Sequence, residues 1–313
     1  MINLIKQLST KILSGSFSKR ELVLTYYYWK LEKREDRLKK QKVTKPVRLN
    51  SYNSEFGYEL IATIPYAYWL FKNGLLKGTI SGKDTQCFYY FSPCHEINPE
   101  QRSGSIGKVK KVDLMYKAGI PNCYIHKPYL NLEKWEAPPY KKIYSNDWAK
   151  FEKPTFVVYN RYNNEWPGKI NKPINYFSLD FLAELFSILN RNYQVLYCNI
   201  EGQKDLYDNS PPLFLNDYNL CKEQKVTHIK DLLTKHPELT YNQIQLYYFS
   251  NCENFLTMNG GGGILASYFG GRNIIYTKFC TELQRGDYGY YHLLGNSKIM
   301  VVKTYDEIRK ILY

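Results

Sequence analysis

Four consecutive glycines form the strongest chemical signal in this chain. Gly260, Gly261, Gly262 and Gly263 follow Asn259. The apolar run before Asn259, NFLTM, is typical of a strand, and the run after the glycines, ILASYF, is typical of a helix. Backbone N–H groups without flanking side chains, at the end of a strand and the start of a helix, suit a phosphate or diphosphate. The alternative is a turn in which glycine only permits positive φ. We favour ligand contact, because a turn does not need four glycines.

Two other polar segments could complete such a site, because each follows a strand-like run. The first holds Asn160, Arg161 and Glu165, and the second holds Glu282, Arg285 and Asp287. Arginine can pair with a diphosphate through two parallel hydrogen bonds, and glutamate can accept hydrogen bonds from sugar or ribose hydroxyls. An exposed, asparagine-rich turn is an alternative interpretation of the first segment.

A third junction, NSEFGYEL, places a carboxylate near the start of a helix in the first half of the chain. Glu55 is a candidate base that would take a proton from the hydroxyl group of a substrate. Asn53 and Gly57 would lie on the side of that accepting hydroxyl group, and Gly57 would permit its close approach. An acid favoured by the helix dipole is an equally good interpretation of Glu55. His95 is the competing base, since histidine titrates near neutral pH.

Several catalytic classes lack their motifs. The chain contains no HExxH, no GxSxG, no GK[ST] after the glycines and no spaced-glycine dinucleotide fingerprint. Its 7 cysteines include no CxxC pair, which argues against a disulfide framework or a structural zinc site and favours a reducing compartment. We therefore expect no metal site, and a cytoplasmic protein.

The elements that would position these residues are clearest in the second half. Strand-like runs alternate with helix-like runs, which predicts a doubly wound parallel sheet. The predicted strands are 155–160, 194–199, 254–258, 273–276 and 301–302, and the helices are 177–190, 225–234, 241–250, 264–269 and 305–312. Ser178 and Thr240 are the expected N-caps. In the first half we predict a strand at 46–52, a helix at 58–73 kinked at Pro65, a turn at 78–82 and a strand at 86–92; residues 130–150 are left as a connection.

Charge divides the chain into the same two halves. The 313 residues favour two domains, and residues 1–150 carry a net charge of +13 against +1 for residues 151–313, out of +14 in all. We place the boundary near residues 151–154. No apolar run is long enough to span a membrane, and the N-terminus does not read as a secretory signal.

Much of the positive charge lies in a predicted helix at residues 19–42. Such a helix could rest on an acidic membrane surface, which would make the protein peripheral. It could instead be a solvated helix that packs one stripe on its domain. Nucleic acid is a third partner, which we do not expect, because no nucleic-acid-binding motif accompanies the charge.

Two of these junctions resemble motifs of known enzymes. NGGGGILASYFG resembles the HGAGL-type junction of xylosyltransferase-like families, and SEFGYEL resembles the GRFGNQ junction of fucosyltransferase-like families. Asn259 stands where the first motif has histidine, and Glu55 where the second has arginine. With the loop that carries Arg161, the second half looks like the donor domain of a GT-B glycosyltransferase.

The resemblance implies an α/β fold of two Rossmann-like domains with parallel sheets, which face a cleft that holds a nucleotide sugar. The nucleotide sugar would be a co-substrate, no other cofactor is expected, and the acceptor would be a glycan or glycolipid. The absence of a DxD triplet agrees with a metal-independent transfer. A sugar- or nucleotide-binding module without catalysis is the alternative function, and a nucleic-acid-binding protein is a less favoured one.

Overall fold

The computed structural model describes residues 43–51, 56–98, 132–163, 173–199, 213–280, 282–283 and 286–313. Within them lie two sheets, one of three strands and one of six, and every strand pair in both is parallel. The predicted α/β class with parallel sheets is confirmed. The predicted basic helix at 19–42 lies outside the described residues.

The six-stranded sheet has the order β6-β5-β4-β7-β8-β9. Its strands are β4 (Thr155–Asn160), β5 (Gln194–Asn199), β6 (Thr227–His228), β7 (Cys252–Met258), β8 (Arg272–Tyr276) and β9 (Lys298–Val302). All of β4 is buried, which explains why TFVVYN is almost continuously apolar or aromatic. The strands predicted at 155–160 and 194–199 match the structure at both ends.

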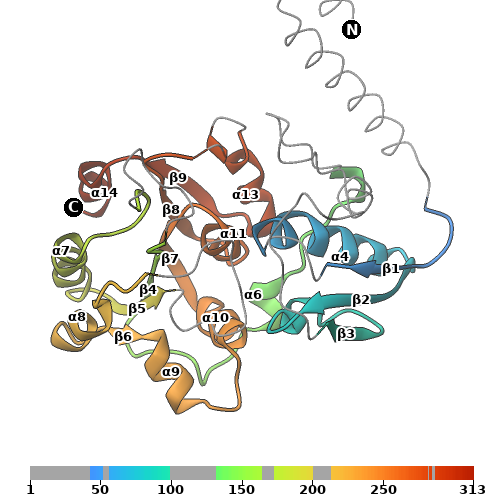
Figure 1. Cartoon of the computed structure of the whole chain (residues 1–313), viewed down its shortest axis with the longest axis horizontal. Helices are drawn as coiled ribbons and strands as arrows, with labels where there is room; N and C mark the ends of the chain where they lie inside the picture. Colours follow the sequence, from blue (N-terminus) through green and yellow to red (C-terminus); the bar gives the residue numbers. More distant parts are fainter. Residues whose placement is uncertain are drawn as a thin grey trace, which may run out of the picture.

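Helices cover both faces of this sheet, so the second half has three layers (Figure 1). One face carries α7 (Leu179–Leu189), α8 (Asp217–Glu223) and α14 (Tyr305–Leu312). The other carries α9 (Ile229–Lys235), α10 (Tyr241–Phe249), α11 (Gly261–Ser267) and α13 (Tyr288–Gly295). Alternate strand residues enter the two cores; for example, Val158 packs with α7, whereas Val157 and Tyr159 belong to the core on the other face.

Capping residues set where two of the predicted helices begin. The Ser178 side chain accepts a hydrogen bond from Phe181 N at the start of α7. Thr240 and Gln243 form a reciprocal capping box at the start of α10. Both expected N-caps are confirmed. The helix predicted at 225–234 divides into the short strand β6 and α9, whose capping residue is His228.

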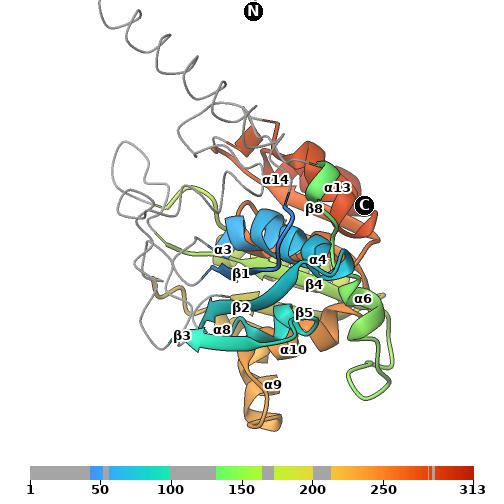
Figure 2. The same ribbon diagram turned by 90° about the vertical axis from the view of Figure 1, so that its right-hand side faces the viewer.

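The three-stranded sheet belongs to the first half and has the order β1-β2-β3, with β1 (Val47–Asn50), β2 (Leu76–Gly82) and β3 (His95–Asn98). Figure 2 shows these strands side by side with α4 (Ile64–Lys72) along them. The turn predicted at 78–82 is wrong, because this segment is part of β2. Gly78 permits the close pairing of β2 with the chain before β3, since a Cβ atom there would lie 2.6 Å from Cys94 O.

The strand predicted at 86–92 is also wrong. QCFY forms the 3-10 helix η2 (Gln86–Tyr89), although its aromatic composition favours a strand. Phe88 and Tyr89 are almost fully buried and pack on neighbouring aromatic rings of the first half, including Phe56 and Phe91. Tertiary packing therefore decides the structure of this short segment.

The predicted helix at 58–73 is confirmed, and a π-helical segment lies directly before Pro65, the residue at which a kink was predicted. It consists of α3 (Phe56–Tyr58), the π-helix η1 (Glu59–Thr63) and α4. Ile64 N donates to Glu59 O, five residues back. Pro65 has no N–H to give to the Leu60 and Ile61 carbonyls. Side chains from elsewhere serve them instead.

One of those side chains joins the two halves of the chain. Tyr268, the C-cap residue of α11, donates from its hydroxyl to Leu60 O at 2.5 Å. Within the first half, Trp135 donates from Nε1 to Ile61 O at 2.8 Å. One buried apolar cluster includes residues of both halves. The division into domains at residues 150 and 151 stays a prediction.

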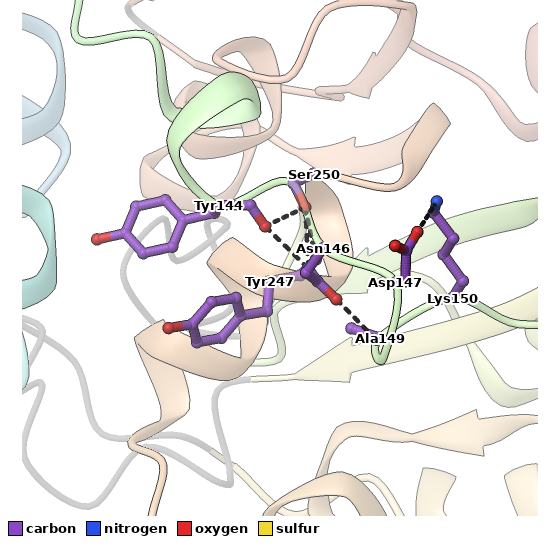
Figure 3. Close-up of polar contacts among 7 residues, drawn as sticks. All are labelled: Tyr144, Asn146, Asp147, Ala149, Lys150, Tyr247 and Ser250. Atoms are coloured by element: carbon purple, nitrogen blue, oxygen red, sulfur yellow. Dashed lines mark hydrogen bonds and ion pairs between the residues drawn. The ribbon is translucent and has the colours of Figure 1, made fainter.

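The predicted connection at 130–150 contains two short helices, η4 (Leu132–Lys134) and α6 (Tyr140–Ile143). Figure 3 shows how its end is held on α10. Asn146 donates from Nδ2 to Tyr247 O at 3.0 Å and accepts from Ala149 N at 2.7 Å, while Ser250 donates to Tyr144 O at 2.8 Å. The connection is thus fixed to the second half by its own side chains.

Candidate functional site

The strand order places the two strongest sequence signals side by side. From β4 the chain proceeds outward through β5 to β6, and from β7 it proceeds in the opposite direction through β8 to β9. The pair β4 and β7 is therefore the point where the strand order reverses, and open parallel sheets bind ligands beyond the carboxyl ends of such strands. Arg161 follows β4, and the glycine junction, residues 259–263, follows β7.

Neighbouring groups occupy the space that side chains at the glycine positions would need. A Cβ atom on Gly260 would lie 2.7 Å from Arg161 Nη1, and one on Gly262 would lie 2.8 Å from the Tyr159 ring. A Cβ atom on Gly261 would lie 2.9 Å from Phe56 Cδ1. Gly260, with φ of 102°, precedes α11, so the predicted loop at 260–263 is wrong: the helix begins within the glycines. Residues 260–262 remain half-buried rather than enclosed.

Arg161 is the cation at this point. Its guanidinium lies against Gly260, and its N–H donates to Asn160 Oδ1 at 3.0 Å. Burial raises the pKa of the adjacent Tyr159 to about 12, and the neighbouring Tyr241 hydroxyl and the Arg161 charge oppose that rise. Tyr159 is therefore a neutral hydroxyl at neutral pH, and the arginine supplies positive charge beside the glycines.

Asn160 has a structural role that the sequence did not reveal. It is 1% exposed, donates from Nδ2 to Phe177 O at 3.1 Å and accepts from Phe177 N at 2.9 Å. These two bonds fix the segment before α7 to the end of β4. The amide therefore positions the loop that carries Arg161.

Two buried polar groups lie at the ends of the next strands. Asn259 is 3% exposed and Thr277 is 1% exposed, and within the described part of the chain Asn259 Nδ2 and Thr277 Oγ1 have no hydrogen-bond partner. By strand alternation both side chains lie on the same face of the sheet as Arg161. Sequence reasoning missed Thr277, although a polar residue directly after the buried run NIIY is a usable signal.

Gly57 is the residue that connects the first-half junction to the glycines. A Cβ atom on Gly57 would lie 3.4 Å from Ile264 Cδ1 and 3.8 Å from Gly261 N, and Phe56 packs on Gly261. The structure thus brings the two junctions that the sequence selected into contact. Asn53 and Glu55 lie outside the described residues.

His95 sits in a separate polar cluster of the three-stranded sheet. Its Nδ1 lies 2.7 Å from Thr79 Oγ1 and its Nε2 lies 3.1 Å from Ser81 Oγ. Burial lowers the pKa of His95, with smaller opposing effects from Glu59 and Glu96. The imidazole is therefore neutral at neutral pH, but both of its nitrogens are already engaged.

Beside His95 lies a buried carboxylate that sequence reasoning did not single out. Glu59 is 0% exposed, and its Oε1 accepts from Ser51 Oγ and from Tyr89 OH, each at 2.7 Å. The Tyr89 ring also stacks on His95, with ring centroids 5.3 Å apart. This cluster fixes the end of β1 to η1 and the edge of β3.

The structure describes part of the predicted polar segment that holds Glu282, Arg285 and Asp287. Glu282 and Asp287 close a turn through the bond from Asp287 N to Glu282 O at 3.0 Å, and the helix α13 begins directly after Asp287. Glu165 and Arg285 lie outside the described residues.

The described residues contain neither a cluster suited to a metal ion nor a helix suited to a membrane. No group of three or more His, Cys, Asp or Glu side chains is placed to hold a metal ion there. No helix in the same residues has the length and apolarity needed to cross a membrane.

Comparisons with known proteins find similarity among solved structures. No protein-family model and no curated protein sequence matches this chain. Among solved structures, E. coli ADP-heptose LPS heptosyltransferase II is similar over 85% of this chain and 98% of that one, with 11% identity and a TM-score of 0.38. At this level of similarity the comparison identifies neither a donor nor an acceptor.

Proposed function

We propose that this chain is a glycosyltransferase that moves a sugar from a nucleotide-sugar donor to a glycan or glycolipid acceptor, without a metal ion. The observation that carries the proposal is the Arg161 guanidinium lying against Gly260 where the strand order reverses. The resemblance of both junctions to sugar-transferase motifs supports the same function. The lack of a DxD triplet supports the metal-independent form.

The proposed chemistry depends on charge that develops on the departing diphosphate. Arg161 and the N–H groups of the half-buried glycines 260–262 would offset that charge, and Asn259 Nδ2 is a further donor already removed from water. Fixed donors of this kind need little reorganisation during the reaction. Thr277 would hold the same part of the donor.

The acceptor would approach from the first half of the chain. Phe56 and Gly57 contact the glycine junction, and Glu55 precedes them in the sequence. We propose Glu55 as the base that takes the acceptor proton, in preference to His95, whose two nitrogens already contact hydroxyls. The net charge of +13 in residues 1–150 would attract an anionic acceptor, or an acidic membrane surface that carries it.

A thermal-shift and titration series with nucleotides and nucleotide sugars tests the donor site. Replacing Arg161 with Ala should weaken binding of the best donor about 10- to 100-fold, the range for hydrogen bonds to a charged group. Arg191→Ala is the matched control, because Arg191 is exposed on the turn after α7. Equal donor affinities of the two variants would contradict the proposal. A melting temperature that rises with DNA but with none of the nucleotides would contradict it too.

A substitution of the proposed base, Glu55, distinguishes an enzyme from a binding module. Glu55→Gln should abolish sugar transfer while leaving donor affinity within about twofold, because a base acts on the acceptor rather than on the diphosphate. A protein that binds a nucleotide sugar but shows no hydrolysis or transfer with any acceptor tested would be a module.

A further inference from the structure

A second pocket lies on the other face of the six-stranded sheet from the glycine junction. It has a volume of about 480 Å³, within the range of small-molecule sites, and it is lined by the segment before α7, the ends of β8 and β9 and the first turns of α14. Figure 1 shows α7 and α14 together on this face, opposite α11. The pocket is therefore distinct from the proposed donor site.

Aromatic rings form one wall of this pocket. The Tyr276 and Tyr305 rings lie 5.3 Å apart, and Tyr305 stacks on Phe181 at 3.9 Å. The Tyr305 hydroxyl accepts from Ser178 N at 3.1 Å and donates to Tyr176 O at 2.8 Å. Burial raises the pKa of Tyr276 to about 12, so this ring is uncharged. The wall is held in place and suits the flat or apolar face of a ring.

Unpaired positive charge forms the other part of the lining. Arg309 is committed to Glu184, with Nε to Oε1 and Nη2 to Oε2 both at 2.7 Å, and to Asp306 at 2.5 Å. Lys278 and Lys303 are exposed, and in the described part of the chain neither ammonium group has an ion-pair partner.

The two lysines extend from neighbouring strand ends. Thr277 N donates to Val302 O at 2.9 Å, so β8 and β9 remain paired up to the residues that precede Lys278 and Lys303. Asp306, the only acid among the lining residues, is neutralised by Arg309. The pocket thus offers two free ammonium groups beside an aromatic wall, which is the chemistry that recognises an anion attached to a ring.

We propose that this pocket binds a phosphate monoester carried on a ring, with the phosphate between Lys278 and Lys303 and the ring against the partly exposed Tyr305, which the buried Tyr276 supports. A sugar phosphate and a nucleoside monophosphate share this chemistry. The proposal does not depend on the function of the glycine junction, because the two sites use different residues on opposite faces of the sheet.

Isothermal titration of the full chain with inorganic phosphate, a hexose 6-phosphate and a nucleoside monophosphate tests this inference. One ring-bearing phosphate should bind more tightly than inorganic phosphate, and the tighter of the two identifies the source. Each of Lys278→Ala and Lys303→Ala should weaken that binding about three- to tenfold, since exposed charged pairs contribute up to about this much. The double variant should weaken it further.

Lys310→Ala is the matched control, because Lys310 is an exposed lysine of α14 outside the pocket. It should leave the affinity within about twofold, as a single distant surface charge is largely screened. Arg161→Ala should also leave it unchanged. Binding that is lost with Arg161 and kept in the double lysine variant would assign the phosphate to the glycine junction and overturn the inference. So would the absence of binding by all three probes.

Discussion

Replacing Gly262 with alanine tests whether the glycine junction exists to admit Tyr159. The new Cβ atom would lie 2.8 Å from two carbons of the Tyr159 ring and 3.1 Å from a third. The ring cannot easily move, because Tyr159 is 5% exposed and lies in the buried central strand β4. Overpacking of this kind costs about 1–3 kcal/mol. Alanine also gains up to about 1 kcal/mol of helix propensity over glycine.

Gly289→Ala provides the control that isolates the packing effect. Gly289 lies in α13, and no atom lies within 4 Å of the position of its Cβ. Both variants gain helix propensity, so the difference between their free energies of unfolding should approximate the overpacking cost of about 1–3 kcal/mol. Urea unfolding followed by circular dichroism measures both values.

A donor titration on the same two proteins extends the test to function. A displaced Tyr159 would disturb Arg161 two residues later, so Gly262→Ala should bind donor more weakly than Gly289→Ala does. If the two variants are equally stable, Tyr159 does not occupy the space beside Gly262 and the reasoning about the junction fails. Equal donor affinities in proteins of unequal stability would refute only the link to Arg161.

Two further predictions concern carbonyl and imidazole groups in the first half of the chain. Tyr268→Phe removes the donor to Leu60 O, which Pro65 cannot replace, so the free energy of unfolding should fall by about 1–3 kcal/mol. Tyr313→Phe is the control, because Tyr313 is exposed, and it should leave the free energy of unfolding nearly unchanged. Equal effects of the two substitutions in urea unfolding would contradict this prediction. His95 has a pKa lowered from 6.5 in the folded protein, so the unfolded state binds the proton first as pH falls, and stability should rise with pH through this window. His95→Gln should remove part of that rise, and an unchanged pH profile of thermal unfolding would show that burial does not act on His95.

Much of the second half could be predicted because local and tertiary preferences agree there. TFVVYN and QVLYCN are buried strands, and FSLDFLAELFSILN combines an amphipathic pattern with a serine cap. The alternation of strands and helices then leaves few parallel topologies. The contact between Arg161 and Gly260 is a consequence of that topology.

The errors occur where packing overrides local preference. GTISG, residues 78–82, was predicted as a turn and has a glycine at each end, which disfavours a strand, yet Gly78 is what allows β2 to approach Cys94. QCFYYFS looks like a strand, but burial of its aromatic rings stabilises a 3-10 helix. Asn160 was expected to contact a ligand, and its bonds to Phe177 could not be inferred without knowing which segment lies beside β4.

The bond from Tyr268 to Leu60 O, a carbonyl that Pro65 leaves without a helical donor, ties the two halves of the chain together. Opening the two halves like a hinge would expose Leu60 O and break its bond to Tyr268, whereas the bond from Trp135 to Ile61 O lies within the first half and would remain. A buried acceptor that loses its donor costs about 1–3 kcal/mol. The Tyr268 bond and the apolar cluster shared by the halves oppose a hinge motion, so a cross-link between the halves should leave the rate of the proposed sugar transfer unaffected.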